Sequence, residues 1–87
     1  MEKRKEKTMS NQGKIVELDL RQMPPFERHD KIFEIWESLK PGEAIRIIND
    51  HNPKPLHYQF DAEQKGKYEW TDEQSGPKDW IAKIKRI

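Results

Sequence analysis

The chain has 87 residues, of which 38% are charged and 32% hydrophobic, with a formal net charge of +1 and no cysteine. This length suits a single domain with a small core. The lack of cysteine excludes disulfides, cysteine-held metal clusters and thiol chemistry. No apolar run reaches membrane-spanning length, and the charged start lacks the apolar region of a signal peptide, so we expect a cytoplasmic protein with no membrane contact.

The first 13 residues are expected to form a disordered charged tail, because they contain almost no apolar side chains. The basic residues of this tail are Lys3, Arg4, Lys5 and Lys7. The folded part, residues 14–87, is therefore slightly acidic. It also lacks a stripe of basic and aromatic residues, which argues against nucleic-acid binding.

The first half of the domain is predicted to be a strand followed by a helix. Residues 14–20 alternate, with Val16, Leu18 and Leu20 on one face. Pro25 suits the first turn of a helix, and the sequence Pro41-Gly42 ends it. The apolar stripe of this helix, at helical spacing, consists of Ile32, Phe33, Trp36 and Leu39.

The second half is predicted to contain three strands and a helix. Residues 43–48 form a more apolar and so more central strand, and a helix runs from about Pro55 to Gln64. Residues 67–71 form a third strand, residues 72–77 a polar hairpin loop and residues 79–87 a fourth strand. The side chains expected to face inward from the second helix are Leu56 and Phe60, with Tyr58 and Ala62 as further candidates.

The order β-α-β-α-β-β predicts an α/β two-layer sandwich with both helices on one face of a four-stranded sheet. The short connection between the first two strands implies a right-handed crossover, so these strands are parallel and end at the same edge. Ligands favour this edge in open α/β sheets. The residues that we expect there as a ligand-binding site are Arg21, His29, Asp50, His51, Lys54 and His57.

Each of these residues also has a structural explanation. His29 can cap the apolar stripe, Asp50 is a common turn former, and Arg21 can pair with a nearby carboxylate on the surface. As a site, the group is suited to a divalent metal held by His29 and His51, or to a small anion held by cationic side chains. Acid–base chemistry by His51 with Asp50 is a further option, whereas no serine lies near this edge to serve as a nucleophile.

Three blocks of the chain together resemble a bacterial domain-of-unknown-function family, number 2249 (DUF2249). They are residues 17–33, residues 39–43, and the block that contains Asp50-His51-x-Pro53-Lys54-Pro55-Leu56. That family looks like a distant relative of sulfur carriers of the SirA/TusA type. The resemblance implies a mixed sheet in which the last strand lies antiparallel between the second and third. Sulfur carriers have Cys-Pro where this chain has Pro24-Pro25, so persulfide transfer by its own side chains is excluded.

Related domains are joined to hemerythrin-like or cupin domains, which suggests redox or metal physiology. The leading interpretation is a small non-catalytic binding or regulatory module whose ligand is a metal, a small anion or a partner protein. The alternative is an enzyme or accessory carrier that uses His29 and His51 as acid–base groups or metal ligands.

Overall fold

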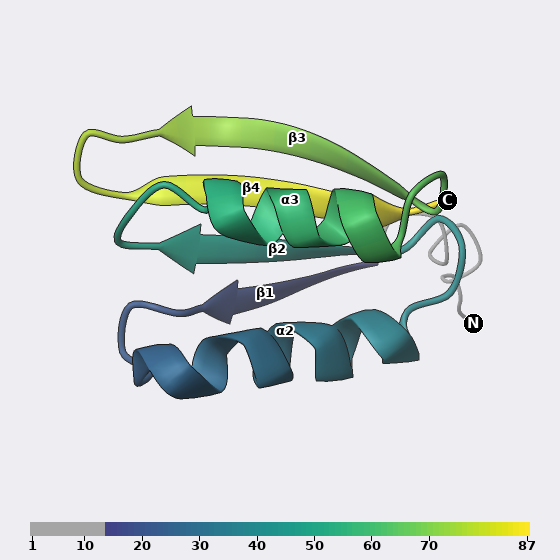
Figure 1. Ribbon diagram of the computed structural model, residues 1–87, viewed down its shortest axis with the longest axis horizontal. Helices are drawn as coiled ribbons and strands as arrows, with labels where there is room; N and C mark the ends of the chain where they lie inside the picture. Colours follow the sequence, from purple (N-terminus) through teal and green to yellow (C-terminus); the bar gives the residue numbers. More distant parts are fainter. Residues whose placement is uncertain (1–13) are drawn as a thin grey trace, which may run out of the picture.

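The computed structural model describes residues 14–87 and contains four strands and two helices (Figure 1). In chain order they are β1 (Ile15–Asp19), α2 (Pro25–Ser38), β2 (Ala44–Asn49), α3 (Lys54–Glu63), β3 (Tyr68–Ser75) and β4 (Trp80–Arg86). The predicted tail, residues 1–13, lies outside the described residues. Neither helix of the described part is long and apolar enough to cross a membrane.

The sheet has the strand order β1-β2-β4-β3. β1 runs parallel to β2, with Val16 opposite Ile45, and β4 is antiparallel to both of its neighbours. The predicted α/β fold is therefore confirmed, including the parallel crossover and the position of the last strand. Because β1 and β2 point the same way, they end at one edge of the sheet, and α2 and α3 both begin there (Figure 1).

Both helices pack on the same face of the sheet. Trp36 of α2 is fully buried, and its ring meets the ring of Phe60 of α3 edge-on, with the centroids 5.0 Å apart. The predicted core position of Trp36 is confirmed. The other fully buried large side chains are Phe60, Leu20, Ile32, Ile45, Ile47 and Ile84.

Two predictions about individual elements are wrong. Tyr58 is 63% exposed and Ala62 is also exposed, because the buried side of α3 is formed by Leu56 and Phe60 alone. β3 extends to Ser75, through part of the predicted loop, because it pairs with β4 as far as Trp80 after an irregularity between Asp72 and Gln74. The added part of β3 is an exposed edge, so it shows no apolar alternation in the sequence.

Candidate functional site

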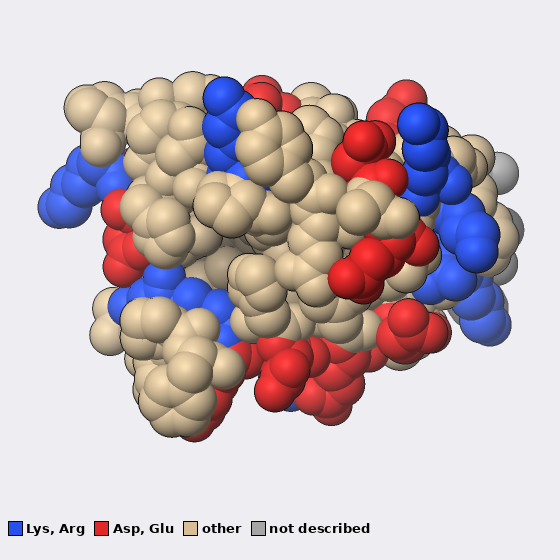
Figure 2. Space-filling view, in the orientation of Figure 1, with Lys and Arg blue, Asp and Glu red and all other residues tan. Residues whose placement is uncertain are grey.

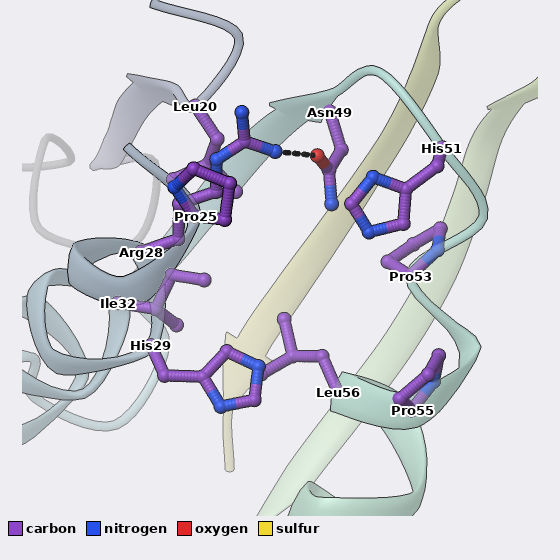
Figure 3. Close-up of a pocket in the computed structure, with 10 residues that line it drawn as sticks. All are labelled: Leu20, Pro25, Arg28, His29, Ile32, Asn49, His51, Pro53, Pro55 and Leu56. Carbon is purple, nitrogen blue, oxygen red and sulfur yellow. Dashed lines mark hydrogen bonds between the residues drawn. The ribbon is translucent and has the colours of Figure 1, made fainter. Parts of the chain in front are cut away.

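A cavity of about 110 Å³ lies where α2 and α3 begin (Figure 3). Its apolar walls are formed by Leu20, Pro25, Ile32, Pro53, Pro55 and Leu56. Its polar walls are formed by Arg28, His29, Asn49 and His51. No carboxylate is among the lining residues. The cavity is therefore mainly apolar, and its charged or polar lining consists of groups that donate hydrogen bonds or can be protonated.

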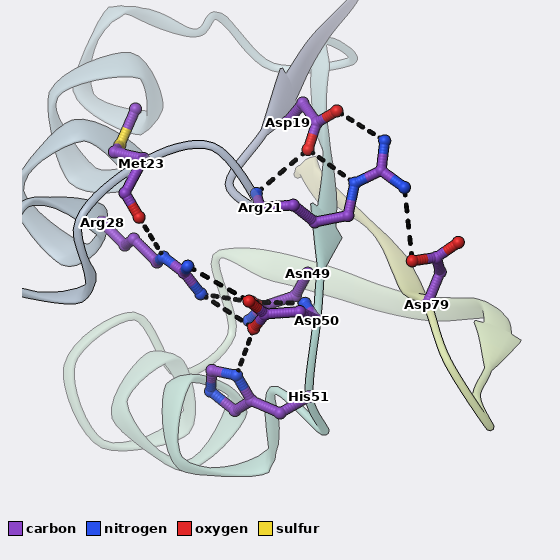
Figure 4. A network of polar contacts seen from close by, with 8 residues as sticks. All are labelled: Asp19, Arg21, Met23, Arg28, Asn49, Asp50, His51 and Asp79. Atoms are coloured by element: carbon purple, nitrogen blue, oxygen red, sulfur yellow. Dashed lines mark hydrogen bonds and ion pairs between the residues drawn. The ribbon is translucent and has the colours of Figure 1, made fainter.

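Arg28 joins the start of α2 to the end of β2. It is only 7% exposed, because position 28 continues the inward stripe of Ile32 one turn towards the N-terminus. Its Nε–H donates to the carbonyl oxygen of Met23 at 2.9 Å, and its Nη1 donates to Oδ1 of Asn49 at 2.9 Å (Figure 4). Nη1 and Nη2 also donate to the two carboxylate oxygens of Asp50, at 3.0 and 3.3 Å. The guanidinium thus fixes the loop after β2 relative to α2.

Asp50 is held between two cationic or donor groups. Besides its bonds from Arg28, its Oδ1 lies 2.7 Å from Nδ1 of His51 (Figure 4). The hydrogen bond from Arg28, and then that from His51, lower the pKa of Asp50 well below its ordinary value of 3.8. An ionised carboxylate only accepts, so Nδ1 of His51 carries the proton, and Nε2 of the neutral ring is left as an acceptor.

Asn49 is a polar residue of β2 that lines the cavity. It is 5% exposed, since it shares the inward face of β2 with Ile45 and Ile47. Its Oδ1 accepts from Nη1 of Arg28 and from the backbone N–H of Asp50, both at 2.9 Å. These two donors fix the orientation of the amide, because oxygen must face them. Its Nδ2 group therefore points into the cavity, where no described residue accepts its hydrogen bonds (Figure 3).

His29 and His51 flank the same cavity, although they come from different elements. His29 lies one turn into α2, and its ring is beside Leu56 of α3, whereas the ring of His51 is beside Asn49 (Figure 3). Both side chains are exposed at one end, so they stand between the cavity and the solvent. The structure thus brings these two predicted site residues together.

Arg21 is at the same edge of the sheet but is bound elsewhere. Its Nε and Nη2 donate to the two carboxylate oxygens of Asp19, at 2.9 and 2.7 Å, and its Nη1 lies 3.3 Å from Asp79 (Figure 4). These bonds lower the pKa of Asp19 to about 2 and raise the pKa of Arg21. Arg21 therefore connects β1 to the start of β4 and does not line the cavity.

Lys54 and His57 line a second, more polar hollow of about 180 Å³. The imidazole of His57 stacks on the indole of Trp70, with centroids 4.2 Å apart and an interplanar angle of 1°. Pro53 lines this hollow as well as the first cavity. The six predicted site residues therefore lie in three separate places. His29 and His51 line the cavity, and Asp50 is bonded to His51 behind it. Arg21 is held in its own ion pairs, while Lys54 and His57 line the second hollow beside Trp70.

The sequence prediction missed Arg28 and Asn49. Arg28 lies in a charged run and was not among the predicted site residues, yet its spacing of four from Ile32 was a signal that it faces inward. Asn49 was expected in the loop, yet alternation with Ile45 and Ile47 placed it on the inward face of the strand. Both are polar residues at positions where the pattern of burial predicts an apolar one. A buried polar residue is more informative about a site than another buried apolar residue.

A metal held by His29 and His51 would need at least one further protein ligand. Across residues 14–87 there is no group of three or more histidine, cysteine, aspartate or glutamate side chains placed to hold a metal ion. Asp50, the carboxylate nearest in sequence, is instead engaged by Arg28. His29 and His51 therefore lack a third protein ligand for a metal within residues 14–87.

Comparison with known proteins gave a match to one family model, which covers residues 17–86 and is described as an uncharacterized conserved protein, DUF2249. No curated protein and no solved structure matched the chain. The matched region contains every residue that lines the cavity. The chain belongs to the DUF2249 family.

Proposed function

We propose that this protein is a small non-catalytic binding module whose ligand is a compact organic carboxylate held in the cavity between α2 and α3. The observation that carries the proposal is the Nδ2 group of Asn49, a donor that faces the cavity and has no acceptor among the described residues. A ligand oxygen that accepts from this group adds a hydrogen bond worth about 0.5–1.5 kcal/mol.

The charges around the cavity favour an anion over a cation. Arg28, His29 and His51 line it, and no carboxylate does. The N-terminal ends of α2 and α3 both border it, through Pro25 and Pro55, and each carries a partial positive charge from its helix dipole. Since Arg28 is already paired with Asp50, the ligand carboxylate is bound by these dipoles and by Asn49, without a direct ion pair.

The size and the walls of the cavity define the rest of the ligand. A cavity of about 150 Å³ takes benzene, so a volume of about 110 Å³ suits about four or five non-hydrogen atoms. Ile32 and Leu56 offer apolar contact to a short hydrocarbon chain. Propionate has this size and this division between an apolar body and an acceptor head.

The test is an NMR titration of the isotopically labelled full chain with propionate, propionamide and n-propylammonium, which share a short chain and differ in the head group. Shifts of the Asn49 side-chain amide and of the His29 and His51 rings report binding. We expect propionate to bind most tightly and propionamide next. The n-propylammonium ion should not bind, because it offers no acceptor.

Asn49→Asp gives the matched variant, because aspartate keeps both oxygen contacts and loses the amide donor. It should weaken propionate binding at least about tenfold, through the lost hydrogen bond and the added repulsion. Asn52→Asp makes the same charge change in the neighbouring loop and should leave binding within about twofold, because Asn52 does not line the cavity. Equal weakening by both variants, or equal binding of n-propylammonium, would contradict the proposal.

A second candidate is acid–base catalysis by His51. It is favoured by the 2.7 Å contact between Nδ1 of His51 and Asp50, which orients the ring with Nε2 free to take a proton. The corresponding test is exchange of the methyl protons of pyruvate for deuterium by the full chain. Exchange that His51→Gln abolishes would favour catalysis, and exchange at the uncatalysed rate would favour binding alone.

The strand order also supports, within this proposal, the likeness to sulfur carriers of the SirA/TusA type. In that comparison Pro24-Pro25 stands where the carriers have Cys-Pro, and Pro25 is one wall of the cavity. We infer a module of the cytoplasm that keeps the carrier fold and uses the same helix start for binding without covalent chemistry.

A further inference from the structure

The outer surface at the start of α2 exposes an apolar group that has no role in the core. Phe26 is 80% exposed, and Pro24 and Pro25 before it are also exposed. Burying a phenylalanine side chain is worth about 1.5–3 kcal/mol, so a partner that covered Phe26 would gain free energy that the isolated chain does not. Phe26 is on a side of α2 away from Arg28 and Ile32, so it cannot reach the core without rotating the helix.

The surface around Phe26 is acidic. Glu27 follows it, and Asp30 is its neighbour one turn further along the helix. An open hollow of about 380 Å³ continues from there along α2. Its lining residues are Met23, Glu27, Asp30, Lys31 and Glu34. Figure 2 shows carboxylates gathered along the lower edge of the molecule, where Figure 1 places α2.

The positive charges on α2 do not neutralise its exposed carboxylates. Arg28 is buried and paired with Asp50, and Lys31 lies 3.6 Å from a carboxylate oxygen of Glu34. The outward carboxylates of α2 are Glu27, Asp30, Glu34 and Glu37, against the single ammonium of Lys31. A partner that covers Phe26 therefore lies against the negative charges around it. These charges favour partner segments with lysine and arginine and disfavour acidic segments.

We propose that the surface formed by Met23, Pro24, Phe26, Glu27, Asp30 and Glu34 docks a cationic segment of another protein. A large apolar side chain of the segment packs on Phe26, and its lysine or arginine side chains pair with the three carboxylates. This surface is separate from the cavity, because none of its six residues lines the cavity. Docking there does not depend on a ligand in the cavity.

The test is a selection of phage-displayed random peptides of about 12 residues on the immobilised full chain. We expect the enriched peptides to carry an excess of Lys and Arg over Asp and Glu, together with an aromatic or large aliphatic residue. Their binding to Phe26→Ser and to the triple variant Glu27→Lys, Asp30→Lys, Glu34→Lys should be at least about tenfold weaker. It should also weaken in about 0.5 M salt, because exposed charges are then screened.

Two controls separate this surface from other causes. A second triple variant, Glu17→Lys, Glu63→Lys, Glu69→Lys, makes the same charge change on exposed positions of other elements and should bind the peptides within about threefold of the unchanged protein. Phe26→Ser removes only an exposed side chain, so its melting temperature should be unchanged and its propionate titration should match that of the unchanged protein.

The proposal is overturned if no peptide is enriched, if the enriched peptides are acidic or neutral, or if both triple variants weaken binding equally. It is also overturned if sedimentation shows a dimer that Phe26→Ser dissociates, because a second copy of the chain would then cover the surface. A positive propionate titration with any of these results would leave the cavity proposal intact and reject the docking surface alone.

Discussion

Arg28 donates to the amide oxygen of Asn49 at 2.9 Å, and this contact decides which end of that amide faces the cavity. The same guanidinium holds Asp50, which in turn holds the ring of His51. One buried cation therefore orients both polar groups on the β2 side of the cavity. Arg28 is a positioning residue for the proposed ligand and need not touch the ligand itself.

We predict that Arg28→Met lowers the free energy of unfolding by about 2–3 kcal/mol, because it leaves Asn49 and Asp50 without their charged donor. Urea unfolding measures this change. The double variant Arg28→Met, Asp50→Asn should lose less than the sum of the two single losses, since the partners interact directly. Strictly additive losses would show that Arg28 and Asp50 are not coupled in stability.

Acid should destabilise the fold through Asp50 and Asp19. Both have a pKa lowered by an arginine, so each contributes stability that is complete above about pH 4 and is lost as the pH falls through the folded-state pKa. For Asp19 that window runs from 3.8 to about 2, and for Asp50 it extends lower. Urea unfolding at pH 4, 3 and 2 should show a smaller loss of stability in Asp19→Asn, Asp50→Asn than in the unchanged protein. An equal loss would place the acid sensitivity elsewhere.

His57 should behave differently from the other two histidines. We predict that His57→Ala removes a stacked pair and lowers the free energy of unfolding by about 0.5–1.5 kcal/mol, while propionate binding is unchanged. His29→Ala should change stability by less than about 0.5 kcal/mol, because its side chain is exposed, yet weaken propionate binding. Thermal unfolding and the same NMR titration measure both. If both histidine variants weaken binding equally, the division into separate places is incorrect.

Trp36→Ala should cost about 3–5 kcal/mol, a large part of the stability of a domain this small. The indole is fully buried against Phe60, and the shorter side chain leaves a void. Circular dichroism with urea titration measures the loss. A loss under about 1 kcal/mol would mean that the core refills the void or does not depend on this ring.

The sequence was sufficient to predict the elements whose apolar residues alternate, as in a strand, or recur at helical spacing. Val16, Leu18 and Leu20 predicted a strand, and Ile32 and Trp36 predicted the buried side of the first helix, because burial imposes those periods. It predicted the end of β3 poorly, since an exposed edge strand has no inward face to mark it in the sequence.

The site was harder to predict because its key groups are buried polar residues. Charged residues in a charged run are normally solvated, so the sequence gives little sign that Arg28 is buried and bonded to Asn49 and Asp50. Edge position alone could not separate Arg21, which is tied to Asp79, from His51, which faces the cavity. Side-chain pairing makes that difference, and it depends on residues distant in the chain.

The most direct test of the central claim is the position of bound propionate in the full chain, measured by intermolecular nuclear Overhauser effects. The account predicts contacts from the propionate methyl group to the methyl groups of Ile32 and Leu56, with a downfield shift of the Asn49 side-chain amide protons on binding. Contacts to Trp70 and His57 instead, or binding without any change at Asn49, would contradict it.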